Sequence, residues 1–203
     1  KGIGLDGRIG EKFLNAGPGF GGSCFPKDTR ALVRIAEDNN TPSHIVNAVV
    51  KVNEDRKAQM SGRIVAACDG SIDGKSIAVL GVTFKPNTDD IRESPSLDII
   101  RDLVVRGANV KVYDPEGMEE AKSIIDDVTW CSTAYEAMVD ANVVTIITEW
   151  NEFRALDLKR IKLLLKEPIL VDFRNIYRPE EMSEEGFYYY SIGRPDVLPK
   201  TEK

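Results

Sequence analysis

Short apolar runs alternate with helical patterns through the greater part of this sequence. The apolar runs predict strands over residues 76–81, 109–114, 128–130, 142–148 and 168–172, with a last edge strand over 187–192. Helical patterns between them cover residues 94–107, 116–125, 133–138 and 157–165. Strands that alternate with helices form βαβ units, whose right-handed crossovers build a parallel sheet. Residues 74–203 are therefore predicted to fold as an α/β, Rossmann-like doubly wound parallel sheet domain.

The residues before this domain predict helices and loops without strands. Residues 1–30 are rich in Gly and Pro and predict a short helix followed by a long loop. A helix is predicted from Thr29 to about Asn39, and a longer one from Pro42 to about Ala67, with Pro42 suited to a first helical turn. The turn-rich residues 69–74 mark the boundary between a helical segment, residues 1–70, and the sheet domain.

Composition argues against several classes of protein. The 203 residues carry a net charge of −6, which argues against a nucleic-acid partner because phosphate binding needs a basic face. No apolar run approaches the ~20 residues that cross a bilayer, so no membrane partner is expected. The cysteines, Cys24, Cys68 and Cys131, are far apart and odd in number. They do not match a disulfide framework or a metal site, and they fit a reducing cytoplasm.

The strongest local feature is the run GPGFGGSCFPKD, residues 17–28. Closely spaced glycines bring bare backbone N–H groups near a partner, as in a phosphate cradle or a tight ligand loop. Cys24 follows directly, with Lys27 three and Asp28 four residues later. A lysine and a nearby helix N-terminus both favour the thiolate form of a cysteine. The residues alone leave a reactive thiol and a buried, inert cysteine equally open.

The predicted strand ends carry a second set of candidates. The first strand is followed by Gly81-Val82-Thr83-Phe84-Lys85-Pro86, so the dinucleotide fingerprint G-x-G-x-x-G is absent there. Asp114 lies where a ribose-binding acid would, but without the glycines we favour a structural role at the strand end. Phe84, Lys85, Arg92 and Arg174 lie just past strand ends, where such sheets bind ligands. An aromatic ring with cations suits a base and a phosphate.

Two long motifs resemble signatures of one enzyme family. The run RIGEKFLNAGPGFGGSCFPKD, residues 8–28, resembles the active-site segment of the UDP-glucose/GDP-mannose dehydrogenase family. The run KPNTDDIRESPS, residues 85–96, resembles a second signature, and Val171-Asp172-Phe173-Arg174 fits as well. The resemblance extends through essentially the whole chain. It implies that the chain is a C-terminal portion, with an NAD-binding domain, a catalytic lysine and a substrate-binding asparagine expected before residue 1.

The resemblance also implies an activity and roles for residues. The activity is a four-electron, NAD-dependent oxidation of UDP-glucose to UDP-glucuronate, with Cys24 as the nucleophile and Asp28 orienting or deprotonating water. Lys27 and Arg92 would face NAD, and the helix over residues 42–67 would help to form a homodimer or a higher homo-oligomer. The residues implied to contact the nucleotide sugar are Arg8 (toward a neighbouring subunit), Phe13, Leu14, Asn15, Ala16, Gly17, Phe20, Gly21, Phe84, Lys85 and Arg174.

Several alternatives remain open at this point. UDP-glucose is favoured over GDP-mannose, and UDP-N-acetyl sugars share the implied architecture. A nucleotide-sugar-binding module without catalysis belongs to another class of function. A thiol acyltransferase of the CoA type would need a histidine base near Cys24, and only His44 is available. We interpret His44 as a surface or capping residue and Cys68 and Cys131 as packing thiols. Phe13 could instead be a core residue, and Arg92 could pair with Asp89, Asp90 or Glu93.

Overall fold

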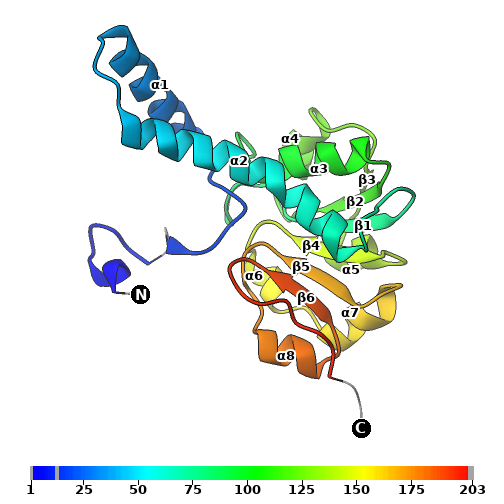
Figure 1. Cartoon of the computed structure of the whole chain (residues 1–203). Helices are drawn as coiled ribbons and strands as arrows, with labels where there is room; N and C mark the ends of the chain where they lie inside the picture. The colour runs from blue at the N-terminus through cyan, green and yellow to red at the C-terminus, as the bar shows by residue number, and fades with distance from the viewer. Residues whose placement is uncertain (1, 12–13, 201–203) are drawn as a thin grey trace.

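A parallel sheet forms the body of the molecule (Figure 1). The computed structural model describes residues 2–11 and 14–200. Within them the strand order is β3-β2-β1-β4-β5-β6, and every neighbouring pair of strands is parallel. The chain reverses its direction of growth between β1 and β4, as in a doubly wound fold, which confirms the predicted fold class. The strands are β1 (Ser76–Leu80), β2 (Asn109–Tyr113), β3 (Thr129–Trp130), β4 (Val143–Ile146), β5 (Ile169–Asp172) and β6 (Tyr188–Ser191).

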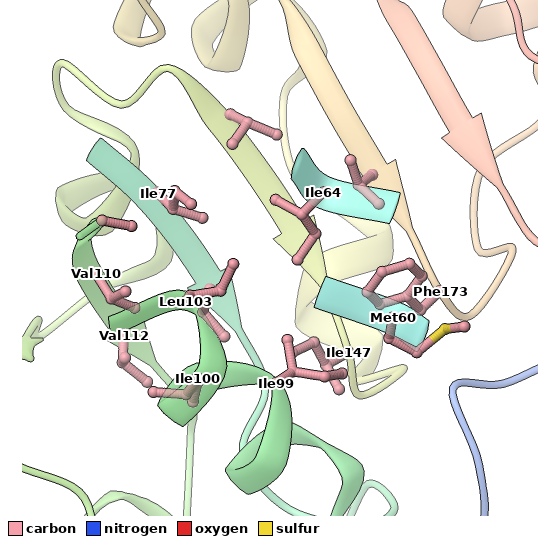
Figure 2. Packing of buried hydrophobic residues seen from close by; sticks show 14 of the residues in the cluster. Met60, Ile64, Ile77, Ile99, Ile100, Leu103, Val110, Val112, Ile147 and Phe173 are labelled. Carbon is pink, nitrogen blue, oxygen red and sulfur yellow. The ribbon is translucent and has the colours of Figure 1, made fainter. Parts of the chain in front are cut away.

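One face of the sheet is covered by α2 (His44–Ala67), α3 (Pro95–Val105) and α4 (Met118–Lys122). Figure 2 shows Met60 and Ile64 of α2 packed among strand residues and the side chains of α3. Ile64 is completely buried. The second half of α2 is therefore part of the sheet domain's core, although it precedes the boundary that the turn-rich residues 69–74 predict.

The opposite face is covered by α5 (Ala134–Met138), α6 (Asn151–Arg154), α7 (Leu158–Leu164) and α8 (Pro179–Glu184). Alternation along β1 explains the two layers, because Ile77 and Val79 face one core while Ala78 and Leu80 face the other. Of these helices, α5 and α7 agree with the predicted ranges 133–138 and 157–165, whereas α6 and α8 were not predicted.

The N-terminal part consists of a short 3₁₀ helix, Ile3–Leu5, a loop, and α1 (Cys24–Asp38). Figure 1 shows α1 and the first half of α2 as an arm that extends away from the sheet. The prediction that this helix starts at Thr29 is wrong, because α1 starts at Cys24. Pro26 lies in its first turn, where a proline removes no helical hydrogen bond. In the described residues no helix is both long enough and apolar enough to cross a membrane.

Candidate functional site

Cys24 is the first residue of α1, and its side chain is exposed. The Ser23 hydroxyl lies 3.6 Å from the Cys24 sulfur. Asp28 is one helical turn further on, so its carboxylate lies on the same face of α1. The Lys27 ammonium lies 3.3 Å from this carboxylate, and both side chains are largely exposed. The alternative of a buried cysteine is therefore wrong, and thiol, carboxylate and ammonium occupy one turn of helix.

The Gly-rich loop before Cys24 is pressed against the loop that follows β1. The Gly22 N–H donates to the Arg92 carbonyl at 2.8 Å. Gly22 has a φ of +88°, and a Cβ there would lie 2.9 Å from the Phe84 ring. A Cβ on Gly21 would lie 2.5 Å from the Glu93 carbonyl oxygen. These glycines are required for close packing against the protein, and they bring Phe84 next to the segment that carries Cys24.

Helix α2 holds the other part of this loop. The Asn53 side chain accepts the Phe20 N–H at 2.7 Å and donates to the Phe20 carbonyl at 3.1 Å. Arg56 donates to the Gly17 carbonyl at 2.9 Å. Sequence reasoning did not identify Asn53 and Arg56. The signal was present, since both are polar residues at helical spacing on the helix that also carries the buried Met60.

A cavity of about 270 Å³ lies between the N-terminal segment and the carboxyl ends of β4 and β5. It is lined by Leu14, Asn15, Ala16, Glu149, Arg154, Arg174, Asn175 and Arg194. Four of the predicted site residues, Leu14, Asn15, Ala16 and Arg174, are thus brought together. Glu149, Arg154 and Arg194 were not predicted, although Glu149 follows the end of β4 closely enough to have been considered.

Arg174 is the least exposed cation of this cavity. It forms an ion pair with Glu149, and the two side chains are 14% and 19% exposed. Among the described residues, the Arg174 Nε and one Glu149 carboxylate oxygen have no hydrogen-bond partner. Arg154 and Arg194 add two more guanidinium groups to the lining. Three arginines facing one carboxylate leave the cavity positively charged, which favours an anionic ligand.

The remaining predicted residues are more dispersed. Lys85 lies over the Phe84 ring at 5.2 Å from its centroid. Arg92 pairs with Asp90 at 2.7 Å, one of the pairings left open by the sequence. Arg8 is exposed and pairs with Asp6 at 2.6 Å, away from the cavity lining. Phe13 lies outside the described residues.

Asp114 and the other two cysteines lie in the interior of the protein. Asp114 is fully buried and accepts hydrogen bonds from four backbone N–H groups and the Trp150 indole, which confirms its structural role. Cys68 and Cys131 are buried, as expected for packing thiols. Burial raises the pKa of Cys68 to about 11 and also raises that of Cys131. Within the described ranges, no group of His, Cys, Asp and Glu side chains is arranged to hold a metal ion.

Comparison with known proteins relates both parts of the chain to one family. Residues 78–179 match the UDP binding domain of the UDP-glucose/GDP-mannose dehydrogenase family, and residues 1–55 match its central domain. A UDP-glucose 6-dehydrogenase of Rhizobium meliloti (strain 1021) is 57% identical over 196 residues, covering 97% of this chain and 45% of the relative. One from Bacillus subtilis (strain 168) is 46% identical over 197 residues, covering 97% of this chain and 42% of the relative.

A solved structure agrees with these sequence matches. The UDP-glucose dehydrogenase of the hyperthermophilic archaeon Pyrobaculum islandicum superposes with a TM-score of 0.76 at 38% identity, covering 89% of this chain and 40% of that one. The chain thus spans less than half the length of the relatives it matches. Because its two parts match two domains of the same family, the chain belongs to the UDP-glucose/GDP-mannose dehydrogenase family.

Proposed function

We propose that this chain supplies the thiol and the nucleotide-sugar site of an NAD-dependent UDP-glucose 6-dehydrogenase. The observation that carries the proposal is the course of residues 14–24, which link the arginine-lined cavity to the exposed Cys24. The similarity to UDP-glucose 6-dehydrogenases of two bacteria supports this substrate class. GDP-mannose and UDP-N-acetyl sugars are the alternative substrates, because proteins named for GDP-mannose and UDP-N-acetyl-mannosamine share the fold.

In the proposed reaction the thiol reacts with an aldehyde intermediate. The 6-hydroxymethyl group of the sugar loses a hydride and a proton to become an aldehyde. The Cys24 sulfur adds to this carbonyl to form a thiohemiacetal, which loses a second hydride and a proton to become a thioester. Water then cleaves the thioester, releasing the carboxylic acid and the free thiol. Asp28, one helical turn from Cys24, is placed to orient that water or take its proton.

Bound NAD would supply the oxidant, accepting one hydride in each oxidation step. The residues beside Cys24 fit an anionic dinucleotide, because Lys27 and Arg92 present exposed cations there. Both cations are paired, with Asp28 and Asp90 respectively. The Lys27–Asp28 pair is exposed on both sides and costs little to rearrange, so Lys27 is available for a phosphate group. In the other pair Arg92 is exposed, whereas Asp90 is only 17% exposed.

The nucleotide end of the substrate is proposed to occupy the cavity. Its guanidinium groups suit a diphosphate, and Asn15 offers an amide group that can hydrogen-bond a base or a ribose. The Asn175 amide is already bonded to the Ile192 backbone. Residues 14–16 line the same space. Arg174 is the residue we expect to matter most, because its side chain is the most buried of the three arginines.

Ligand titration of the 203-residue chain tests this assignment. UDP-glucose should raise the thermal unfolding midpoint more than UDP-N-acetylglucosamine or GDP-mannose does. Arg174→Gln should abolish the shift, because the buried guanidinium is lost. The matched control is Arg178→Gln, an exposed arginine four residues away, which should keep it. The assignment to UDP-glucose would be wrong if GDP-mannose gave the largest shift. The cavity assignment would be wrong if Arg174→Gln bound UDP-glucose normally.

We also infer that the arm formed by α1 and the first half of α2 is the surface through which a homodimer assembles. It exposes Leu32, Ile35, Ile45, Val49 and Val52, with exposed fractions from 39% to 81%. Exposed apolar side chains on these two helices favour a partner that covers them, and a second copy of the chain is the simplest. We place the protein in the cytoplasm, where a reactive thiol such as Cys24 stays reduced.

A further inference from the structure

Glu93 lies where the loop after β1, helix α1 and helix α2 meet. Arg30 of α1 donates two hydrogen bonds to the Glu93 carboxylate, at 3.0 and 3.1 Å. Lys57 of α2 donates to the Glu93 carbonyl at 2.8 Å, and its ammonium lies 3.7 Å from the carboxylate. The Lys57 side chain is only 7% exposed, so its charge is largely desolvated and depends on these partners.

The backbone around Glu93 is fitted to the loop that carries Cys24. Glu93 has a φ of +54°, in the left-handed region that a non-glycine residue adopts only when its surroundings impose it. On its N-terminal side, the Arg92 carbonyl accepts the Gly22 N–H at 2.8 Å. Gly21 packs directly on the Glu93 carbonyl, where no side chain would fit. The position of the loop before Cys24 therefore depends on the position of the loop after β1.

Helix α1 has few other attachments to the sheet domain. Pro26 is its one buried residue. The Arg30 side chain also approaches Glu54 of α2, at 3.8 Å, but this pair is longer than the two bonds to Glu93. The hydrogen bond from Arg30 holds the pKa of Glu93 below its usual range, so the ion pair persists at neutral pH. Glu93 is thus the residue of the β1 loop that ties α1 to the sheet domain through an ion pair.

We infer that Glu93 is a positioning residue for Cys24, because its contacts with Arg30 and Lys57 fix the loop that carries Arg92 against the first turns of α1. The inference rests on the proposed role of Cys24 as nucleophile. The loop that carries Arg92 is joined to the segment that carries the thiol, because Gly22, two residues before Cys24, donates its N–H to the Arg92 carbonyl. Loosening the loop would let the Arg92 guanidinium move away from this segment, and a cation near a thiol favours its reaction.

The test substitutes Glu93→Gln in the 203-residue chain, which keeps the shape of the side chain and removes its charge. Two properties are measured: the rate at which iodoacetamide alkylates Cys24, and amide hydrogen exchange of residues 17–31. Alkylation should slow by roughly threefold, the range of a surface charge interaction. Exchange of residues 17–31 should accelerate while exchange of the sheet does not. Glu93→Asp, which keeps the charge, should restore most of the alkylation rate.

A matched control breaks another ion pair on the same helix. Asp38→Asn removes the Arg34–Asp38 pair, whose atoms are 3.1 Å apart, near the far end of α1. It should change neither property. The inference is overturned if Cys24 of the Glu93→Gln variant is alkylated at the wild-type rate, or if exchange in that variant accelerates throughout β1 and β4, which would indicate general unfolding.

Titration with UDP-glucose on the same samples separates the two proposals. An alkylation effect without UDP-glucose binding contradicts the proposed function alone, and binding without an alkylation effect contradicts the positioning role alone.

Discussion

Two buried aspartates hold the carboxyl ends of β2 and β5. Asp114 accepts the Val82 N–H at 2.7 Å and the Gly117 N–H at 2.8 Å, so it joins the end of β1 to the turn after β2. Asp172 accepts the Arg174 and Ile176 N–H groups and the Tyr189 hydroxyl. Because Arg174 follows Asp172 by two residues, this carboxylate also fixes the start of the segment that lines the cavity. Structural carboxylates thus support the candidate site although neither aspartate lines the cavity.

Asp114→Asn should destabilise the fold substantially. The replacement puts an NH₂ group where a carboxylate oxygen accepts N–H groups, so buried donors would face a donor. We expect the free energy of unfolding to fall by about 3 kcal/mol, in line with loss of a buried charged acceptor. Urea unfolding monitored by circular dichroism measures it. Asp55→Asn, which removes an exposed pair with Lys51, should cost well under 1 kcal/mol. Equal effects of the two substitutions would contradict the structural role of Asp114.

Thiol reactivity should distinguish Cys24 from the other cysteines. Cys68 and Cys131 are 1% and 4% exposed, and burial raises the pKa of Cys68 to about 11. At neutral pH Cys68 is therefore held as the unreactive thiol, while Cys24 is open to solvent. Peptide mapping after brief alkylation should find most label on Cys24. Preferential labelling of Cys68 or Cys131 would contradict this ordering.

At the scale of residues, the sequence indicated which side chains are candidates for chemistry better than it indicated whether they are buried or exposed. Cys24 stands out because glycines precede it and charged residues follow it, yet only the structure shows that its side chain is exposed. Glu149 and Arg194 line the cavity with Arg174 but are far apart in the sequence. Which loops meet at the edge of a sheet is decided by tertiary packing, so local patterns do not contain that information.

At the scale of elements, the apolar patterns predicted every strand of the sheet but missed the short helices α6 and α8. The strands of the sheet agree with prediction to within two residues at each end, because buried parallel strands are continuous apolar runs. Helix α8 was not predicted, although Arg178-Pro179 places a proline at its first position. The six residues of α8 contain one buried apolar side chain, Met182, so they show no apolar stripe, whereas the five-residue α5 buries Ala134, Ala137 and Met138. The start of α1 was predicted too late, because the Gly- and Pro-rich loop continues directly into a helix whose first turn contains Pro26.

The proposed dimer surface on the arm can be tested by a substitution. Ile45 of α2 is 81% exposed, so Ile45→Glu should cost little in folding but should weaken a dimer that buries it. Sedimentation equilibrium should show a dimer for the wild-type chain and a shift towards monomer for the variant. Leu163→Glu is the matched control, because Leu163 is 86% exposed on α7, away from the arm. A wild-type chain that is monomeric at every concentration tested would contradict the proposal.

At the scale of the whole molecule, the candidate site depends on parts that are distant in the sequence. The loop before Cys24 contacts α2 through Asn53, the β1 loop through Gly22, and the Arg174 side chain through Gly17. Small residues let these surfaces approach closely, and a polar face of α2 satisfies the loop's backbone groups. We therefore expect a substitution in α2 that breaks these contacts to alter both the reactivity of the Cys24 thiol and ligand binding in the cavity.

A full-length dehydrogenase that contains this chain would show whether Asp28 acts on water. If Asp28 orients or deprotonates the water that cleaves the thioester, Asp28→Asn should slow hydrolysis more than thioester formation. The first turnover would then be fast and later ones slow, so stopped-flow absorbance should show a burst of NADH followed by a stall. Asp38→Asn, on the same helix but away from Cys24, should turn over steadily. Uniform slowing without a burst would contradict the assigned role.

The same full-length protein allows the two oxidation steps to be separated at Cys24. Cys24→Ala should reduce formation of UDP-glucuronate by several orders of magnitude, because no thiohemiacetal can form without the sulfur. The first hydride transfer takes place at an alcohol and does not need the thiol, so reduction of the UDP-sugar aldehyde by NADH should persist at a measurable rate. UDP-glucose binding should also persist, since Arg174 and the cavity lie apart from the thiol. Formation of UDP-glucuronate near the wild-type rate would contradict covalent catalysis. Loss of aldehyde reduction in a folded variant would instead show that Cys24 also positions the substrate.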